Sequence, residues 1–355
     1  MNRRSLLSAT ALVLAAATTM TACSSTADAG DGSTTTPATE INLGYFANVT
    51  HAPALVGLEN GLFEEALGDT ELKTSVFNAG PATIEALSAG AIDAAYIGPS
   101  PAINTFIKSG GESAVIVAGA TTGGAALVVR DGIDSAADLE GATLATPQLG
   151  NTQDVALRSW LADEGFETST TGGGDVTIQP TENSDTLTLF KAGDLDGAWL
   201  PEPWVSRLVI EGGAHVLVDE ASLWPDGAFP TTLLLVNKTF LTEHPETVKA
   251  LIEGHVAALD WLNANPDDAA AVINARITAE TGKGLADDVL SSALESVSFS
   301  ADPVAGTFPT LVEYAAAAGT GTDGDIDGLF DFTLLNEILT AAGSEPVSAD
   351  GLGKE

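Results

Sequence analysis

The residues of this sequence that could do chemistry are mostly neutral hydrogen-bond donors at turns. The clearest group is the turn Gly150-Asn151-Thr152-Gln153, in which Asn151 or Thr152 would cap a helix predicted over Thr152–Glu164. The free N–H groups of such a helix start, with the Thr152 hydroxyl and the Gln153 amide, could surround the oxygens of a small anion. An ordinary helix cap would carry the same residues, so the pattern alone leaves both interpretations open.

Three other turns carry candidate donors. Ser100 lies between two prolines and is either a helix cap or a ligand donor, while His51 either faces a ligand or takes a surface or capping position. Pro81 belongs to a strand-to-helix turn that would offer backbone contacts only. The nearby basic residues, Lys108 and Arg158, lie inside their predicted helices. We therefore expect any anion to be held by neutral donors and helix dipoles.

Two tryptophans flank the turn Pro201-Glu202-Pro203. We expect Trp199 to pack in the core and Trp204 to form an apolar wall beside a ligand. The Glu202 carboxylate would repel a plain anion but pair with an amine, so an inward-facing Glu202 favours a zwitterionic ligand. The alternative is a solvent-facing carboxylate at a helix start, where the helix dipole favours negative charge.

The elements that must position these turns follow a simple alternation. From Ile41 onward, short apolar runs alternate with helical patterns, which predicts an α/β protein with mainly parallel strands. The apolar runs are Ile41–Phe46, Ala114–Ala118, Leu127–Val129 and Thr232–Val236, and the helix candidates are Thr152–Glu164, Pro245–Asn263 and Pro266–Glu280.

An internal repeat divides the chain into two similar halves. Leu87–Ile97 matches Phe190–Leu200, with glycines 103 residues apart, and this pattern predicts a helix ended by glycine and then a short buried strand. Thr50–Leu55 matches Thr152–Leu157 at an offset of 102 residues. Either match alone could be coincidence, but together they predict two lobes. Such lobes would face each other across a cleft lined by helix starts, where α/β proteins bind ligands.

The composition excludes several classes of protein. With 49 acidic and 13 basic residues, a formal net charge of −36, the chain lacks the basic surface that nucleic-acid binding needs. A hydrophobic content of 45% is too high for a disordered acidic tail. One cysteine cannot form an intramolecular disulfide or a thiolate cluster for zinc. Because the common hydrolase and ATP-binding motifs are absent from the sequence, we predict a protein that is not an enzyme.

The start of the chain resembles a bacterial lipoprotein signal. Two arginines precede the apolar stretch Leu6–Ala17, and Met20-Thr-Ala-Cys23 follows, with Met20 where such signals usually have Leu. We expect residues 1–22 to be removed and Cys23 to be acylated, by either the general or the twin-arginine export route. An ordinary secretory signal is the alternative. Residues 23–39, rich in Ser, Thr and Gly, would form a flexible tether.

Six motifs together are characteristic of one family. They are His51-Ala-Pro-Ala, Glu85–Asp93, Gly98-Pro-Ser-Pro101, Ala137–Gly141, Thr146–Gln153 and Trp199–Trp204. They resemble motifs of the substrate-binding proteins of ABC importers for sulfonates, nitrate and taurine. The resemblance runs from about Ile41 to about Ala342, and the segment Gln148–Leu157 looks most like the alkanesulfonate branch.

The resemblance implies the two-lobed fold of periplasmic binding proteins. Each lobe would be a mainly parallel sheet flanked by helices, and the lobes would close over a ligand in the cleft between them. Two crossings would join the lobes, near Leu127–Arg130 and Phe229–Leu233. The expected parts are 40–127 for the first part of lobe I, 128–230 for lobe II, 231–345 for the return to lobe I with the C-terminal helices, and 346–355 for a tail.

The resemblance also implies a non-catalytic receptor outside the cytoplasm, anchored to the cell membrane through the acylated Cys23. It would capture a small sulfonate, either an alkanesulfonate or a taurine-like solute, and deliver it to a permease with a cytoplasmic ATPase. We expect a monomer that needs no cofactor. The expected ligand-binding residues are His51, Pro81, Ser100, Asn151, Thr152, Gln153, Glu202 and Trp204.

Other ligands and activities stay open. Nitrate would need a small pocket without an apolar wall, whereas an alkanesulfonate would need a longer cleft lined by Trp204 or Trp199. A pyrimidine-like or aromatic solute is a further alternative. An enzyme on the same fold, like the pyrimidine synthases related to these receptors, would carry a cysteine-rich motif and an active-site lysine, and neither is recognisable here.

A metal site is not expected. The segment Asp323–Gly328 resembles the start of a calcium-binding EF-hand loop, with Asp331 at the ninth position. Its twelfth position is Leu334, where calcium needs a bidentate Glu. We therefore predict no metal, although weak calcium binding by the loop Asp323–Asp331 stays open.

The sulfur content is unusual. Removal of residues 1–22 would remove Met1 and Met20 and leave Cys23 as the last sulfur-containing residue of the chain. Avoidance of oxidation outside the cell is one explanation. The other is thrift in a protein made when sulfur is scarce, and that explanation favours a sulfonate ligand over nitrate.

Overall fold

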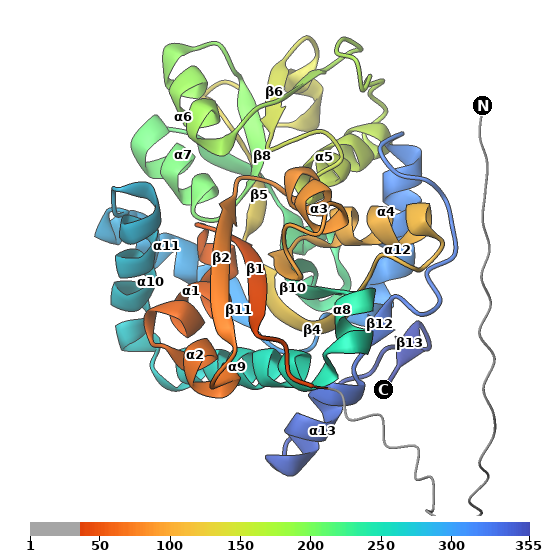
Figure 1. Cartoon of the computed structure of the whole chain (residues 1–355). Helices are drawn as coiled ribbons and strands as arrows, with labels where there is room; N and C mark the ends of the chain where they lie inside the picture. The colour runs from red at the N-terminus through yellow and green to blue at the C-terminus, as the bar shows by residue number, and fades with distance from the viewer. Residues whose placement is uncertain (1–35) are drawn as a thin grey trace, which may run out of the picture. The chain divides into compact units, whose positions relative to one another are not determined.

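The computed structural model describes residues 36–355, which form two β-sheets covered by helices (Figure 1). The expected signal peptide, the acylated Cys23 and nearly all of the expected tether lie outside the described residues. Within residues 36–355, no helix combines the length and the apolar character needed to cross a membrane.

The larger sheet belongs to lobe I. Its strands lie in the order β13-β12-β4-β10-β3-β1-β2, with β11 paired to β4. These strands are β1 (Glu40–Phe46), β2 (Glu71–Phe77), β3 (Ala94–Ile97), β4 (Ala114–Gly123), β10 (Pro230–Asn237), β11 (Val297–Phe299), β12 (Phe330–Asp331) and β13 (Gly353–Lys354). The helices of this part are η1 (Val49–His51), α1 (Ala52–Glu59), α2 (Leu62–Leu67), α3 (Gly80–Ser88), α4 (Pro99–Ser109), α8 (Lys238–Glu243), α9 (Pro245–Ala264), α10 (Pro266–Thr281), α11 (Asp287–Glu295), η5 (Ala305–Thr307), α12 (Phe308–Ala317) and α13 (Thr333–Ala341).

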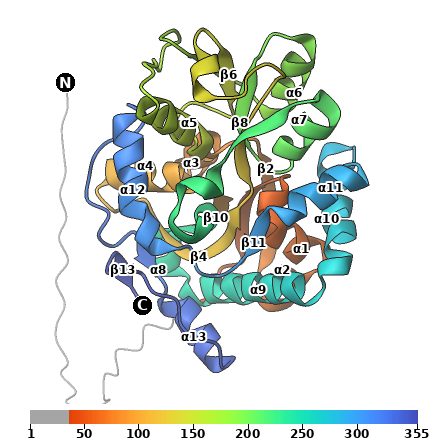
Figure 2. The ribbon, with the colours of Figure 1, turned by 180° about the vertical axis from the view of Figure 1, so that it is seen from behind.

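The smaller sheet forms lobe II, seen from behind in Figure 2, and its strands lie in the order β7-β6-β8-β5-β9. These strands are β5 (Ala125–Val129), β6 (Thr143–Thr146), β7 (Thr177–Pro180), β8 (Gly197–Pro201) and β9 (His215–Asp219). Its helices are η2 (Ala136–Leu139), α5 (Thr152–Asp163), α6 (Asn183–Ala192) and α7 (Trp204–Gly212), and the return to lobe I carries η3 (Glu220–Leu223) and η4 (Pro225–Gly227).

The sequence repeat corresponds to a structural repeat. In lobe I, β1 pairs in parallel with β2 and β3, and in lobe II β6 pairs in parallel with β7 and β8. Gly90 and Gly193 end the matching helices with φ angles of 69° and 90°. Each repeat aspartate then fixes the middle strand of its three-stranded repeat: Asp93 accepts a hydrogen bond from the backbone N–H of Asn42 in β1 over 2.8 Å, and Asp196 accepts one from that of Thr143 in β6 over 2.8 Å.

The α/β fold class with mainly parallel strands is confirmed, and one or two strands of each sheet run the other way. The strands are parallel within each repeat, but β10 is antiparallel to β3 and β4, and β5 is antiparallel to β8 and β9. All other strands except β11 share one direction within their sheet, so both sheets are mainly parallel, with β10 and β11 reversed in the larger sheet and β5 in the smaller. The reason is that β5 and β10, which follow the crossings between lobes, enter each sheet from the opposite direction.

The positions of the crossings differ from the expected ones by a few residues. The chain leaves the larger sheet at Gly123 and Gly124, whose φ angles of 77° and 71° suit glycine, and Leu127 already pairs with Trp199 in the smaller sheet. The return crossing occupies residues 220–229, because β9 ends at Asp219 and β10 begins at Pro230. The expected tail 346–355 also contains β13, an edge strand paired with β12.

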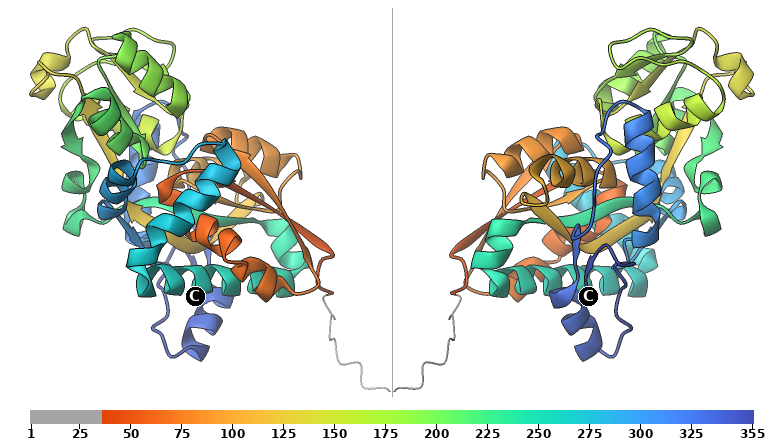
Figure 3. Two further views of the ribbon diagram at one scale, coloured as in Figure 1. Left: turned by 90° about the vertical axis from the view of Figure 1, so that its left-hand side faces the viewer. Right: turned by 90° about the vertical axis from the view of Figure 1, so that its right-hand side faces the viewer.

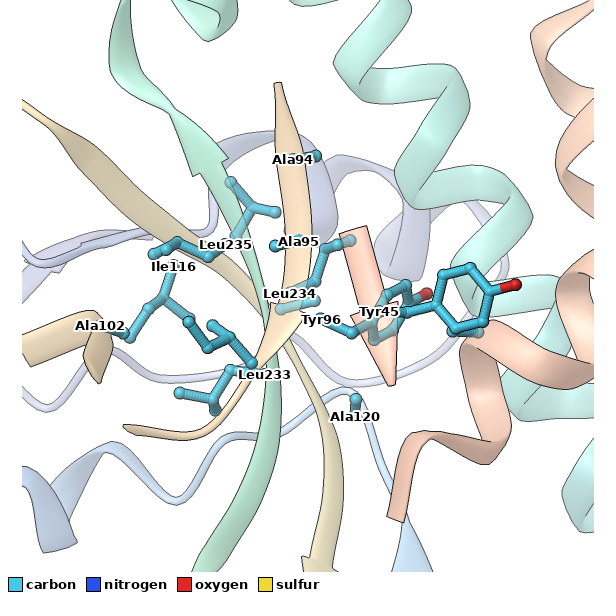
Figure 4. Close-up of a cluster of buried hydrophobic side chains, with 14 of the residues drawn as sticks. Tyr45, Ala94, Ala95, Tyr96, Ala102, Ile116, Ala120, Leu233, Leu234 and Leu235 are labelled. Atoms are coloured by element: carbon cyan, nitrogen blue, oxygen red, sulfur yellow. The ribbon is translucent and has the colours of Figure 1, made fainter. Parts of the chain in front are cut away.

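The core of lobe I lies around the central strands β3 and β10 (Figure 4). The Tyr96 hydroxyl lies 2.8 Å from Nδ1 of the buried His255, whose Nε2 lies 2.8 Å from the carbonyl oxygen of Gly119. Burial lowers the pKa of His255 to about 4, so the ring is neutral at physiological pH. The polar groups of Tyr96 and His255 are therefore paired within the apolar core.

Candidate functional site

Two cavities meet between the lobes. The inner pocket has a volume of about 20 Å³, which is close to the space of one water molecule. The outer cavity is far larger, at about 510 Å³. Asn48, Asn78 and Asn183 line both, so the two adjoin at these three asparagines.

The inner pocket is lined by both lobes and contains no charged side chain. Its lobe I residues are Phe46, Asn48, Thr50, His51, Asn78, Gly98 and Thr231, and its lobe II residues are Pro147, Asn151, Thr152, Gln153, Asn183 and Pro201. The structure therefore brings four of the predicted site residues together, namely His51, Asn151, Thr152 and Gln153. The lining offers amides, hydroxyls, an imidazole and helix starts as hydrogen-bonding groups.

His51 presents a neutral ring to this pocket. The ring is stacked on Phe46, with centroids 4.3 Å apart, and its Nδ1 lies 3.3 Å from the Thr50 hydroxyl. Burial lowers the pKa of His51 to about 3. Its Nε2 has no hydrogen-bond partner among residues 36–355. When the Thr50 hydroxyl donates to Nδ1, Nε2 carries the hydrogen and can donate to a ligand oxygen.

The start of α5 supplies the facing wall. The Asn151 side chain makes no capping hydrogen bond to the helix. Its oxygen instead accepts the backbone N–H of Gly80, in lobe I, over 3.3 Å, and its amide donates to Gln153 over 3.0 Å. The buried Thr152 hydroxyl has no hydrogen-bond partner in the described part of the chain. Because the first N–H groups of a helix also have no acceptor within it, this wall is rich in donors.

A buried ion pair holds this turn, and the sequence analysis did not identify it. One carboxylate oxygen of Asp154 accepts hydrogen bonds from the backbone N–H of Gly150 over 2.9 Å and from Nε of Arg158 over 3.0 Å. The other oxygen accepts a hydrogen bond from the Thr146 hydroxyl over 2.8 Å. Arg158 also donates to the carbonyl oxygen of Ser169 over 3.0 Å. The i,i+4 spacing of Asp154 and Arg158 was the available signal. Arg158 is thus engaged behind the turn and does not line the pocket.

Ser100 and Pro81 lie near the cleft but outside its lining. Ser100 is buried in the first turn of α4, and its hydroxyl has no partner within residues 36–355. It lines neither the inner pocket nor the outer cavity; Gly98, just before α4, takes that place. Pro81 lines a separate cavity between α3 and α4, together with Pro101, because the first turn of α3 packs against α4.

Glu202 points away from both inter-lobe cavities. Its carboxylate accepts the backbone N–H of Ser206 over 3.1 Å and the Ser206 hydroxyl over 2.9 Å, with the Ser296 hydroxyl at 3.5 Å. It is only 3% exposed, and burial raises its pKa to about 7. The helix-start interpretation therefore fits its contacts, although the carboxylate is buried and does not face solvent.

The two tryptophans lie in different surroundings. Trp199 is fully buried in the lobe II core, where its indole N–H donates to Glu220 over 2.7 Å. Trp204 is half-buried and lines the outer cavity. Its indole N–H donates to Asn48 over 3.0 Å, and the Arg207 guanidinium lies 4.6 Å from the ring centroid.

The outer cavity combines apolar and charged walls. Phe77, Ile277 and Leu285 from lobe I face Trp204 and Arg207 from lobe II. The other charged lining residues are Glu182, Glu211, Glu280 and Lys283. Arg207 forms an ion pair with Glu211 over 2.8 Å. The positive charge of Arg207 is therefore already compensated within α7.

Sequence reasoning also missed the three asparagines shared by both cavities. Asn48 comes two residues after β1, Asn78 directly follows β2, and Asn183 begins α6 soon after β7. Their position after the carboxyl ends of strands was the signal that could have found them.

No metal site is apparent among the described residues. Within residues 36–355, no group of three or more His, Cys, Asp or Glu side chains is arranged to hold a metal ion. In the loop that resembles an EF-hand, the Asp331 carboxylate accepts a hydrogen bond from the Lys354 ammonium group over 2.8 Å and another from the Thr333 hydroxyl over 2.8 Å. These contacts occupy the carboxylate that calcium would need.

Comparison with known proteins places this geometry in a family. The taurine-binding periplasmic protein of Escherichia coli is 27% identical over 230 residues, covering 64% of this chain and 68% of that protein. The structure of the alkanesulfonate-binding protein SsuA from Xanthomonas axonopodis pv. citri bound to MOPS has a TM-score of 0.67 at 20% identity, covering 81% of this chain and 96% of that one. The periplasmic nitrate-binding protein NrtA of Synechocystis PCC 6803 has a TM-score of 0.69 at 16% identity, covering 86% and 89%.

The two structures share the fold of this chain, which confirms the expected periplasmic-binding-protein architecture. The resemblance found in the motifs is confirmed as well, because a family model matches residues 34–278. The chain belongs to the NMT1-like family.

Proposed function

We propose that this protein is the solute receptor of an ABC importer and captures a small sulfonate, either an alkanesulfonate or a taurine-like solute. One observation carries the proposal: an uncharged, donor-rich inner pocket adjoins, at three asparagines, a much larger cavity lined partly by aromatic rings. The sulfonate group would occupy the inner pocket and its substituent the outer cavity.

The inner pocket suits a weakly basic oxyanion. A sulfonate keeps its charge at all physiological pH values and accepts hydrogen bonds through three oxygens, so it needs donors and no proton. His51 Nε2, the Thr152 hydroxyl and the start of α5 supply such donors from both lobes. Since the pocket holds only about 20 Å³, a sulfonate would enter as the lobes move slightly apart and would remain between them.

The outer cavity favours a ligand with a substituent over nitrate. Its volume of about 510 Å³ and the Trp204 ring offer contact area to an alkyl chain. A taurine amine would find carboxylates there, such as Glu182, rather than at Glu202. Nitrate stays the main alternative, because it would fill the inner pocket alone, and a pyrimidine-like or aromatic solute is a further one.

The membrane partners follow from the same proposal. The receptor would work outside the cytoplasm as a monomer, anchored through acylated Cys23, and would deliver its solute to a permease with a cytoplasmic ATPase. It would not be an enzyme and would use no cofactor. Among residues 24–355 there is no methionine and no cysteine, which supports a role in a cell that is short of sulfur.

Calorimetry tests the ligand directly. Residues 24–355 would be titrated with pentanesulfonate, taurine and nitrate, and we expect heat with at least one sulfonate. Heat with nitrate alone would establish the alternative ligand. A protein that binds none of the sulfonates would rule out the proposed solute, while the family and fold would stand.

A further inference from the structure

A third cavity runs along α5. It has a volume of about 130 Å³, several times the space that one water needs. Thr152 lines both this cavity and the inner pocket. The remaining wall comes from three elements: α5 of lobe II, the return crossing around η3, and α12, which runs beside α5 in Figure 3.

Aromatic rings form much of this wall. Trp160 comes from α5, Trp224 from the return crossing and Tyr314 from α12. The Trp224 and Tyr314 rings pack edge to face with centroids 5.8 Å apart, and Trp224 is stacked on Phe229 behind it. Leu223 and Leu311 add apolar surface. Three rings from three separate segments thus line one space, which we call the cage.

The charge in and around the cage is negative. Glu220 lines the cavity while only 2% exposed, and the exposed Asp163 lies at its rim. None of the lining residues is Lys, Arg or His. The pKa of Tyr314 is raised, mainly by burial and further by the charges of Asp163, Glu313 and Glu220. Burial raises the pKa of Glu220 to about 7, because a buried carboxylate without a neighbouring cation is costly, and an occupant with a positive charge would favour the charged form.

We propose that this cage binds a small organic ammonium ion, with Trp160, Trp224 and Tyr314 around its alkyl groups and Glu220 as its counter-ion. Aromatic cages attract alkylated ammonium ions because the ring faces carry partial negative charge. The Trp199 indole N–H donates to one oxygen of Glu220 over 2.7 Å and so fixes the position of the carboxyl group at the cavity wall. This assignment is independent of the solute bound in the cleft.

Fluorescence offers the test, since two tryptophans line the cage. The full chain would be titrated with choline chloride at constant ionic strength, and in parallel with 3,3-dimethyl-1-butanol, the uncharged counterpart of choline. We expect a saturable change in tryptophan emission with choline and binding of the alcohol at least about tenfold weaker. No saturable response to choline, or equal responses to both compounds, would overturn the proposal.

Matched variants locate the response. Glu220→Gln should weaken choline binding by at least about tenfold, whereas Asp226→Asn, an exposed acidic residue of the same crossing that does not line the cage, should leave it unchanged. Circular dichroism checks that both fold. If Glu220→Gln does not fold, the half-buried Tyr314→Leu decides: it should also weaken choline binding, and unchanged affinity would refute the cage.

Discussion

The indole N–H of Trp204, at the first residue of α7, donates to the side-chain oxygen of Asn48, which precedes η1 in the other lobe, over 3.0 Å. A second bond joins the lobes nearby, from the Gly80 N–H to Asn151. Both involve residues that line or border the inner pocket. The contacts that surround the proposed ligand site are therefore also contacts that close the cleft.

Removing either partner of the Trp204–Asn48 bond should weaken ligand binding without unfolding the protein. We expect Trp204→Phe and Asn48→Ala each to weaken sulfonate binding by about fivefold, because a neutral hydrogen bond contributes about 1 kcal/mol. In a double-mutant cycle measured by calorimetry, the two effects should overlap rather than add. Full additivity would show that the bond does not contribute to closure.

A methyl group at Gly98 should hold the lobes apart. A Cβ built there would lie 2.4 Å from the Thr152 hydroxyl oxygen, and Thr152 is buried and β-branched, so it cannot move aside easily. We expect Gly98→Ala to weaken ligand binding by at least about tenfold while the melting temperature changes little. Gly212→Ala, at the end of α7, is the control, and equal loss of affinity in both variants would contradict this steric explanation.

Loss of the cation in the buried pair should destabilise lobe II. Arg158→Met leaves the Asp154 carboxylate buried without a counter-ion, which should lower the free energy of unfolding by about 3–5 kcal/mol. Urea denaturation measures the loss. Lys73→Met, which breaks the exposed pair with Glu40, should have little effect. A small effect of Arg158→Met would mean that the turn at Gly150 is held by its other contacts.

The His51 ring should stay neutral across the physiological range. Because burial lowers its pKa to about 3, NMR of the ring should show no titration between pH 5 and 8. His51→Ala should weaken sulfonate binding by roughly 10- to 100-fold, as expected for the loss of a hydrogen bond to a charged ligand. A ring that titrates near pH 6.5 would disprove the neutral-donor role.

Glu202 should make stability depend on pH. Its pKa is raised from 4.5 in the unfolded chain to about 7 in the folded protein, so the folded state binds more protons between these values. Relative to Glu202→Gln, the wild type should therefore lose stability as pH rises from about 4.5 to 7, by roughly 3 kcal/mol in total. Urea denaturation of both proteins across this range measures the difference. A constant difference would show that Glu202 titrates normally.

Local patterns predicted much of the fold and part of the site. The repeat predicted two lobes because Gly90 with Asp93, and Gly193 with Asp196, end a helix and fix a strand in the same way. The turn 150–153 and His51 were predictable as inner-pocket residues. Each lies where a helix begins after the end of a strand, and such positions gather at one edge of a sheet.

Other features depend on contacts between distant segments, which no local pattern contains. Besides the nearby Ser206, the Glu202 carboxylate has a partner at 3.5 Å in Ser296, more than ninety residues later in the chain. The outer cavity owes one wall to Ile277 and Leu285, far from the strands that end at the cleft. The first crossing was predicted a few residues too late, because the apolar run of β5 continues that of β4 in the sequence. The chain turns between these two strands at Gly123 and Gly124, which have positive φ angles.

The uncharged lining of the inner pocket has a kinetic consequence. The pocket contributes no charged side chain, while the chain as a whole carries a formal net charge of −36. An approaching anion is therefore repelled at long range and gains its binding energy only on contact. Dissolved salt screens this repulsion over about 10 Å at 0.1 M ionic strength. Capture of the anionic solute that we propose should thus be faster in brackish surroundings than in fresh water.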